Sequence, residues 1–192
     1  MLSDVQRLQL VDIAWQSLRY GLDHGRPSQV DETALDETLS APGASFVTLH
    51  RNGQLRGCIG SLEAYQSLAA DVAQNAFSAA FRDPRFPPLD KDELKDLTLE
   101  VSVLTSPEAM TFSSEQDLLR QLRPGVDGLI LEDCGQRGTF LPSVWESLPH
   151  PVEFLQQLKR KAGLPENHWS AETRVWRYTT EKFGSEAQNN SA

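Results

Sequence analysis

The residues best suited to chemistry lie together in the segment Arg56-Gly57-Cys58-Ile59-Gly60. Side chains alternate along a β-strand, so the sequence predicts Arg56 and Cys58 on one face of a strand. A guanidinium on the same side as a thiol favours the thiolate, the form of cysteine that acts as a nucleophile. Glycines weaken a strand and are tolerated where a backbone or a ligand comes close. The segment therefore predicts a small pocket that accepts an anion or carries a nucleophile.

A purely structural role for Cys58 is the competing interpretation, because a free cysteine is most often an inert buried residue. Asn52-Gly53 predicts a two-residue type I′ turn between two strands. That turn places Cys58 opposite Val47 and places His50 on the other face of the hairpin. A pair between Cys58 and His50 would thus need a β-bulge that shifts the register.

Further candidates lie outside this segment. Asp83 and Arg85 follow a predicted helix, and Glu100 lies on the polar face of a predicted strand; a solvated surface is the alternative for all three. Cys134 is interpreted as incidental, since the acidic residues beside it raise the pKa of its thiol. The four histidines show no metal-ligand spacing, so neither a metal site nor a cofactor is predicted.

Composition limits the classes of function. The chain of 192 residues carries a formal net charge of −9, which makes nucleic acid an unlikely partner because phosphate binding depends on lysine and arginine. The sequence contains no apolar run long enough for a membrane span and no secretory signal, so we expect a cytoplasmic protein without membrane association. Two cysteines far apart do not form a disulfide framework.

Hydrophobic spacing predicts an α+β fold with a mainly antiparallel sheet and packed helices. Ser3 and Gln6 form a capping box that starts a helix ending at Gly25. A second long helix is expected from about Leu62, which would place its positive N-terminal end just after Gly60. The polar tail, residues 184–192, is expected to be disordered. The remaining predicted helices cover 31–39, 113–122 and 151–162, and the predicted strands cover 45–50, 54–60, 97–104, 126–132, 139–141 and 174–178.

Several motifs together resemble the AMMECR domain family, whose bacterial and archaeal members are often called AmmeMemoRadiSam system protein A. The hallmark hexapeptide of that family is similar to residues 55–60, and the resemblance spans about Val5 to Phe183. One departure is Asp127, where some members carry histidine. The other matching stretches are Asp83-Pro84-Arg85-Phe86-Pro87-Pro88, Leu99-Glu100-Val101-Ser102-Val103-Leu104, Gly125-Val126-Asp127-Gly128-Leu129, Thr139-Phe140-Leu141-Pro142 and Lys161-Ala162-Gly163.

The resemblance implies one AMMECR-type domain over residues 1–183, with a larger and a smaller lobe and with the hexapeptide bordering a cleft. It also implies partnership with a Memo-type protein and a radical SAM enzyme, but no established reaction. We expect a binding or accessory component that holds a small anionic ligand or a partner loop. The expected ligand-binding residues are Arg56, Gly57, Gly60, Asp83, Arg85 and Glu100. The alternative is a cysteine-dependent enzyme with Cys58 as its nucleophile, and a nucleic-acid-processing factor is a weaker third interpretation.

Overall fold

The computed structural model describes residues 1–186 and divides the chain into two compact units. Within the described residues, the larger unit comprises Met1–Leu104 and residues 181–186, and the smaller unit comprises Thr105–Thr180. Every strand pairing whose register is described is antiparallel. The prediction of an α+β fold with a mainly antiparallel sheet and a larger and a smaller lobe is confirmed.

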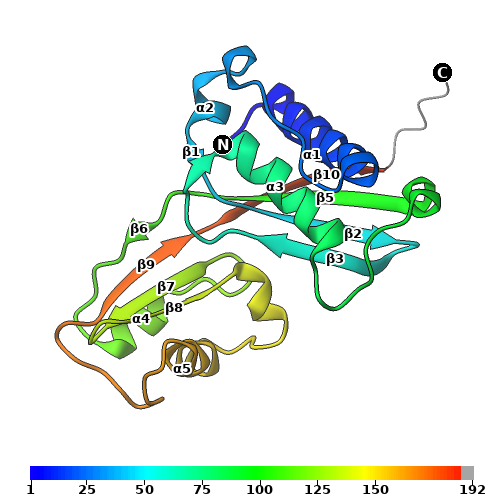
Figure 1. The fold of residues 1–192 in the computed structure, drawn as a ribbon. Helices are drawn as coiled ribbons and strands as arrows, with labels where there is room; N and C mark the ends of the chain where they lie inside the picture. The colour runs from blue at the N-terminus through cyan, green and yellow to red at the C-terminus, as the bar shows by residue number, and fades with distance from the viewer. Residues whose placement is uncertain (187–192) are drawn as a thin grey trace. The chain divides into compact units, whose positions relative to one another are not determined.

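The larger unit is built on a four-stranded sheet with the order β10-β5-β2-β3, and α1 and α3 pack together on one face of it (Figure 1). Leu49, Val101 and similar side chains of that face are fully buried against the helices. The opposite face carries polar side chains instead. The elements of this unit are α1 (Asp4–His24), η1 (Glu32–Ala34), α2 (Glu37–Ser40), β1 (Pro42–Gly43), β2 (Ser45–Arg51), β3 (Gln54–Gly60), β4 (Gln66–Ser67), α3 (Leu68–Phe81), η2 (Lys91–Asp96), β5 (Leu97–Leu104) and β10 (Thr180–Glu186).

The smaller unit has its own sheet, with the order β6-β9-β7-β8, and its own apolar core. Trp145 stacks on Phe154 of α5 with 3.7 Å between ring centroids, and its indole NH donates to the carbonyl of Asp127. Both aromatic rings therefore belong to this core. The elements of this unit are β6 (Glu108–Ala109), α4 (Glu115–Gln121), β7 (Gly128–Asp133), β8 (Gln136–Phe140), η3 (Pro142–Glu146), α5 (Pro151–Lys161) and β9 (Arg174–Tyr178).

Local signals in the sequence account for several element ends. The Ser3–Gln6 capping box starts α1, and Gly25 ends it with a φ of 66°. Asn52 and Gly53 form the turn of the β2–β3 hairpin, with φ of 51° and 77° as a type I′ turn requires. These two predictions are confirmed.

Two predicted boundaries are wrong. Helix α3 begins at Leu68 with Ser67 as its N-cap, because residues 66–67 pair with Pro42–Gly43 as a short strand. The first turn of the helix nevertheless lies close to this segment, because Ser61, the residue after Gly60, donates its hydroxyl to Asp71 of that turn at 2.7 Å. Strand β10 runs to Glu186, so residues 184–186 belong to the sheet rather than to a disordered tail. The rest of the predicted tail lies outside the described residues.

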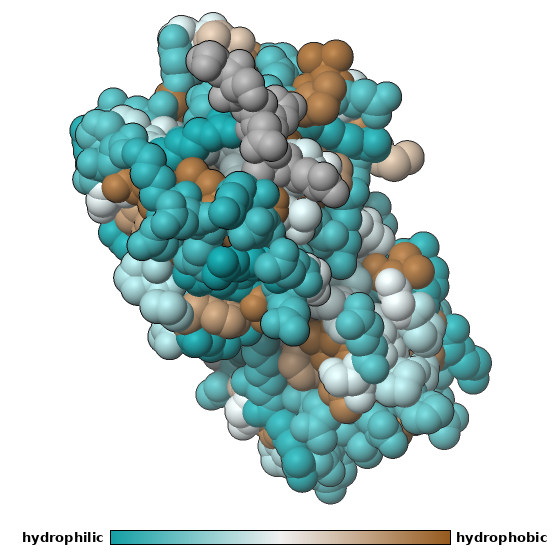
Figure 2. Space-filling view, turned by 90° about the vertical axis from the view of Figure 1, so that its right-hand side faces the viewer, coloured by the Kyte–Doolittle hydropathy of each residue, from teal (hydrophilic) through white to brown (hydrophobic). Residues whose placement is uncertain are grey.

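Among residues 1–186, no helix combines the length and the apolarity that crossing a bilayer requires. Figure 2 shows one face of the molecule, where hydrophilic residues cover most of the surface and apolar groups form small separate areas.

Candidate functional site

A β-bulge at Arg56 determines where Cys58 points. The pairing of β2 with β3 runs from Arg51↔Gln54 and His50↔Leu55 to Leu49↔Gly57 and Thr48↔Cys58, which leaves Arg56 as the extra residue. Two predictions are therefore wrong. Cys58 does not pair with Val47, and Arg56 and Cys58 do not follow the regular alternation that would place them on one face of the strand. After the bulge, Cys58 lies on the same polar face as Thr48, whose hydroxyl donates to Cys58 Sγ at 3.3 Å.

Arg56 is buried and committed to a carboxylate of its own chain. Its Nε and Nη2 donate to Glu93 Oε1 and Oε2, both at 2.9 Å, and Nη2 also donates to the carbonyl of Pro87 at 3.0 Å. Hydrogen bonding to Arg56 lowers the pKa of Glu93 to about 2, against the opposing effect of burial. Arg56 thus fastens the segment before β5 to β3. Its remaining nitrogen, Nη1, is buried and has no hydrogen-bond partner among the described residues, and its role in ligand binding stays a prediction.

The two glycines of the segment are required by packing within the chain. A Cβ at Gly57 would lie 2.1 Å from the carbonyl oxygen of Ala79, so α3 could not pack this closely on β3. A Cβ at Gly60 would lie 2.2 Å from the ring of Phe46, its partner on β2. The close approaches that these glycines permit are therefore made by a helix and an aromatic ring, where the sequence predicts a ligand.

Asp83 and Arg85 hold the backbone of Cys58 from both sides. Asp83 Oδ2 accepts from the Cys58 amide at 2.9 Å, and Arg85 Nη2 donates to the Cys58 carbonyl at 3.3 Å. The two side chains also form an ion pair at 2.7 Å. Hydrogen bonds from Arg85, together with that from the Cys58 amide, hold the pKa of the Asp83 carboxyl well below its usual range. Asp83 is buried, whereas the side chain of Arg85 is 53% exposed and faces solvent beside Cys58.

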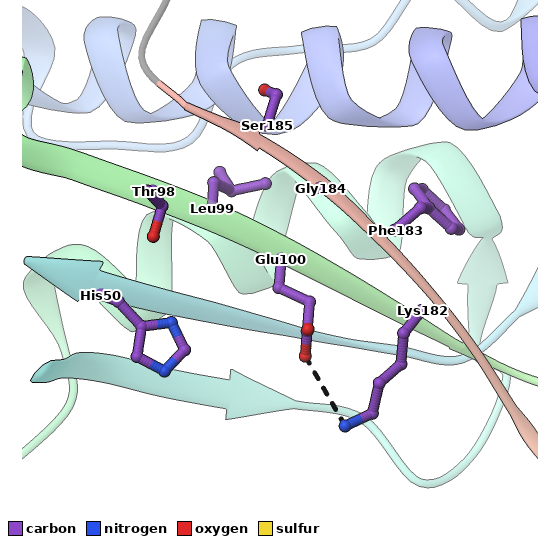
Figure 3. A pocket seen from close by; sticks show the side chains of 8 residues that line it. All are labelled: His50, Thr98, Leu99, Glu100, Lys182, Phe183, Gly184 and Ser185. Atoms are coloured by element: carbon purple, nitrogen blue, oxygen red, sulfur yellow. Dashed lines mark ion pairs between the residues drawn. The ribbon is translucent and has the colours of Figure 1, made fainter. Parts of the chain in front are cut away.

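A row of four polar side chains crosses the open face of the sheet from β3 to β10. Cys58 and Glu100 both pair with Thr48, and cross-strand partners share a face. Glu100 continues the row to Lys182 of β10, with 3.7 Å between carboxylate oxygen and ammonium nitrogen (Figure 3). The row therefore joins a thiol, a hydroxyl, a carboxylate and an ammonium group.

One pocket of about 340 Å³ lies at the Glu100–Lys182 end of this row, and Cys58 is not among the residues that line it. In Figure 3, the side chains of His50, Thr98, Glu100 and Lys182 extend toward the open side of the sheet, and Ser185 points toward α1. The Ser185 hydroxyl accepts from the indole NH of Trp15 on that side, at 3.0 Å. A volume of this size suits a small molecule. Sequence reasoning missed Lys182, because β10 is too polar to be identified as a strand.

The bulge also moves Cys58 onto the face that carries His50. Cys58 pairs with Thr48, which lies two residues before His50 on β2, so the two side chains are diagonal neighbours on one face. Within residues 1–186, no side-chain hydrogen bond to His50 is described, and the thiol accepts its hydrogen bond from Thr48. The site thus has a thiol without a general base in contact with it.

Comparison with known proteins identifies the family. The family model AMMECR1 matches residues 11–183. The chain belongs to the AMMECR1 family. A protein of Methanothermobacter thermautotrophicus is 44% identical over 144 residues, covering 72% of this chain and 73% of that protein. A protein of Thermotoga maritima is 37% identical over 162 residues, covering 83% and 88%. The crystal structure of the uncharacterized protein PH0010 from Pyrococcus horikoshii is similar, with a TM-score of 0.76, 34% identity and coverage of 93% and 90%.

Proposed function

We propose that this AMMECR1-family chain is a binding component that holds a small anionic molecule on the open face of the β10-β5-β2-β3 sheet. The observation that carries the proposal is the polar row from Cys58 to Lys182, with the exposed guanidinium of Arg85 beside its Cys58 end. The one cation of the row, Lys182, and the neighbouring Arg85 are each about half exposed in a chain whose net charge is −9. Cations that are open to solvent within an acidic protein favour an anionic ligand.

Arg85 is prepared for such a ligand by its partner. Asp83 accepts from Nε and Nη2 of Arg85, at 2.9 and 2.7 Å, which fixes the plane of the guanidinium without covering its outer edge. A guanidinium held in one orientation binds carboxylate or phosphate with less loss of conformational freedom. We infer that Asp83 acts by positioning Arg85, which would contact a ligand at the Cys58 end of the row, while Lys182 would contact a ligand in the pocket at the other end.

Calorimetric titration with inorganic phosphate, pyrophosphate and citrate tests this proposal. One of the three probes is expected to bind saturably. The variant Lys182→Gln is expected to weaken that binding about tenfold or more, because a hydrogen bond to a charged group contributes about 1.5–3 kcal/mol. Lys91→Gln is the matched control, since the Lys91 ammonium contacts Asp23 of α1 and not the polar row.

Arg85→Gln should weaken the same binding, and its fold is checked by circular dichroism because Asp83 loses a partner. Absence of saturable binding for all three probes would refute the proposal. So would a Lys182→Gln variant that binds as tightly as the unaltered chain, since that variant leaves no buried group unpaired.

A cysteine-dependent enzyme is the second candidate, because the bulge brings Cys58 to the open face rather than the core. Its test is the rate of Cys58 alkylation as a function of pH in a Cys134→Ser background. Reaction well below the ordinary thiol pKa of about 8.5 would favour a nucleophile. Alkylation only near that pH would favour the binding role.

The partnership with a Memo-type protein and a radical SAM enzyme, which the family resemblance implies, is part of the same proposal. We expect such partners to deliver the ligand to the polar row or to remove it from there. Sedimentation of the chain mixed with either protein, with and without Lys182→Gln, would test it. Equal complex formation by both variants would place the contact elsewhere.

A further inference from the structure

Three side chains that form no recognisable spacing motif in the sequence lie together in the smaller unit. Asp133 ends β7, Cys134 lies in the turn that follows, and His168 lies in the loop before β9. One ligand atom from each lies within 4.8 Å of the others. A carboxylate, a thiolate and an imidazole are the donor set of zinc-class metal ions.

The carboxylate of Asp133 is buried, and its two oxygens differ in the hydrogen bonds that they accept. Its Oδ2 accepts from His168 Nε2 at 2.9 Å, from the Ser170 hydroxyl at 2.8 Å and from the Thr173 hydroxyl at 2.5 Å. Its Oδ1 is buried and, among the described residues, receives no hydrogen bond of normal geometry. The Cys134 thiol, a weak donor, is the remaining group that interacts with this carboxylate. A buried carboxylate oxygen that no stronger donor satisfies is costly in free energy, so it can take a stronger partner.

The surroundings of that oxygen suit a cation. The Cys134 thiol interacts with the same carboxylate, which raises the pKa of the thiol through a hydrogen bond and through charge repulsion. Cys134 is exposed, so an ion could enter from solvent. The Ser170 and Thr173 hydroxyls already orient the carboxylate, as partners of metal ligands commonly do.

We propose that Asp133, Cys134 and His168 bind one divalent metal ion of the zinc class. Asp133 contributes Oδ1, Cys134 contributes its thiolate, and His168 contributes Nε2 as a neutral imidazole whose proton is on Nδ1. Zinc bonds of about 2.0–2.3 Å separate tetrahedral donors by about 3.3–3.7 Å. Donor atoms that already lie within 4.8 Å of one another therefore need only modest side-chain movement to bind one ion. The fourth position faces solvent, where water completes the tetrahedron.

The charges balance in this arrangement. Two anionic ligands, Asp133 and Cys134, neutralise the divalent ion, the Cys134 proton passes to solvent, and His168 binds as a neutral imidazole. Thr173 and Ser170 keep their hydrogen bonds to Oδ2. The ion would join the β7–β8 turn to the loop before β9, two segments that the Asp133 network already connects.

The test uses the full chain stripped of metal with a chelator and titrated with Co²⁺, a spectroscopic substitute for Zn²⁺. One equivalent of Co²⁺ is expected to produce a thiolate-to-cobalt charge-transfer band and intense tetrahedral d–d bands, both lost when Zn²⁺ is added. Cys134→Ser should abolish the charge-transfer band. Cys58→Ser, which alters the thiol of the larger unit, should leave it intact.

Two further variants probe the remaining ligands. His168→Gln removes a ligand and is expected to weaken Co²⁺ binding at least tenfold. Thr173→Val removes a residue that orients the Asp133 carboxylate and is expected to weaken binding about tenfold, the lower end of the usual effect of such a change. Circular dichroism of the metal-free variants confirms that each is folded. The proposal is overturned if the unaltered chain gives no band with excess Co²⁺, if Cys134→Ser retains it, or if His168→Gln binds Co²⁺ unchanged.

Discussion

Substituting Glu93 by glutamine tests whether the buried ion pair with Arg56 holds the bulge in place. Arg56 and Glu93 are only 9% and 13% exposed, and two parallel hydrogen bonds join them. Glu93→Gln removes the charge of one partner and leaves the guanidinium of Arg56 buried. Breaking a buried pair in this way usually costs about 3–5 kcal/mol.

The pKa of Glu93 gives an independent value for the stability that the ion pair contributes. A fall from 4.5 to about 2 corresponds to about 3 kcal/mol of stability, because each tenfold change in proton affinity is worth about 1.4 kcal/mol. A lowered folded-state pKa means that this contribution is complete above the unfolded value of 4.5 and is lost as the pH falls toward 2. The stability difference between the two proteins should therefore be about 3 kcal/mol at neutral pH and should shrink below about pH 4.5.

Urea unfolding followed by circular dichroism, repeated between neutral and acidic pH, measures this difference. Peptide-resolved hydrogen exchange assigns the loss to β3 and α3, which is necessary because the chain has two compact units. Asp92→Asn is the matched control: an exposed carboxylate in the same η2 helix, expected to change stability by less than about 0.5 kcal/mol. A difference below about 1 kcal/mol, or one that stays constant with pH, would refute the role assigned to the ion pair.

Two other predictions follow from contacts in each unit. Gly57→Ala should lower the free energy of unfolding by about 1–3 kcal/mol or more, measured in urea, because the new Cβ meets a helix carbonyl that cannot rotate away; an unchanged urea midpoint would contradict the packing role. In metal-free protein, Cys134 alkylation should begin at a higher pH than for an ordinary thiol, because the Asp133 carboxylate raises the Cys134 pKa. Asp133→Asn should move that onset to lower pH in a mass-spectrometric assay, and an identical profile would show that the carboxylate has no effect.

Local signals in the sequence were sufficient for elements that depend on neighbouring residues. The capping box at Ser3, the Asn52-Gly53 turn and the alternation of Leu97 to Leu104 each predict an element that the structure contains. Each depends on contacts within a few residues or on a periodic pattern. The overall α+β class follows from the order of these elements.

The errors share a different origin, because they depend on residues distant in the sequence. Arg56 bulges out of the ladder to meet Glu93, which is 37 residues away. Strand β4 replaces the first predicted turns of α3 by pairing with Pro42–Gly43. In β10, Gly184 packs against the backbone of Leu99. The sequence of this strand has no alternation of apolar residues from which it could be predicted. The cluster of Asp133 and His168 joins residues 35 apart and has no spacing motif.

The bulge explains why the segment around Cys58 combines a charged residue with small ones. Without it, Cys58 would lie opposite Val47 and face the apolar core, the usual environment of a free cysteine. With it, Ile59 takes the position opposite Val47 and Cys58 joins Thr48 on the open face. Replacing both partners of a buried ion pair by apolar side chains often costs no stability, although removing one partner does, so the use of a pair here favours a positional role.

Bulges that re-aim one side chain are common beside functional sites. Here the backbone of Cys58 is also held on both sides, by the Asp83 carboxylate and by the Arg85 guanidinium. Three devices, the bulge, the buried pair and these two contacts, thus fix the direction of one small side chain. A cysteine that served only to fill space would need none of them, which is the strongest reason to seek the ligand of this protein at the Cys58 end of the polar row.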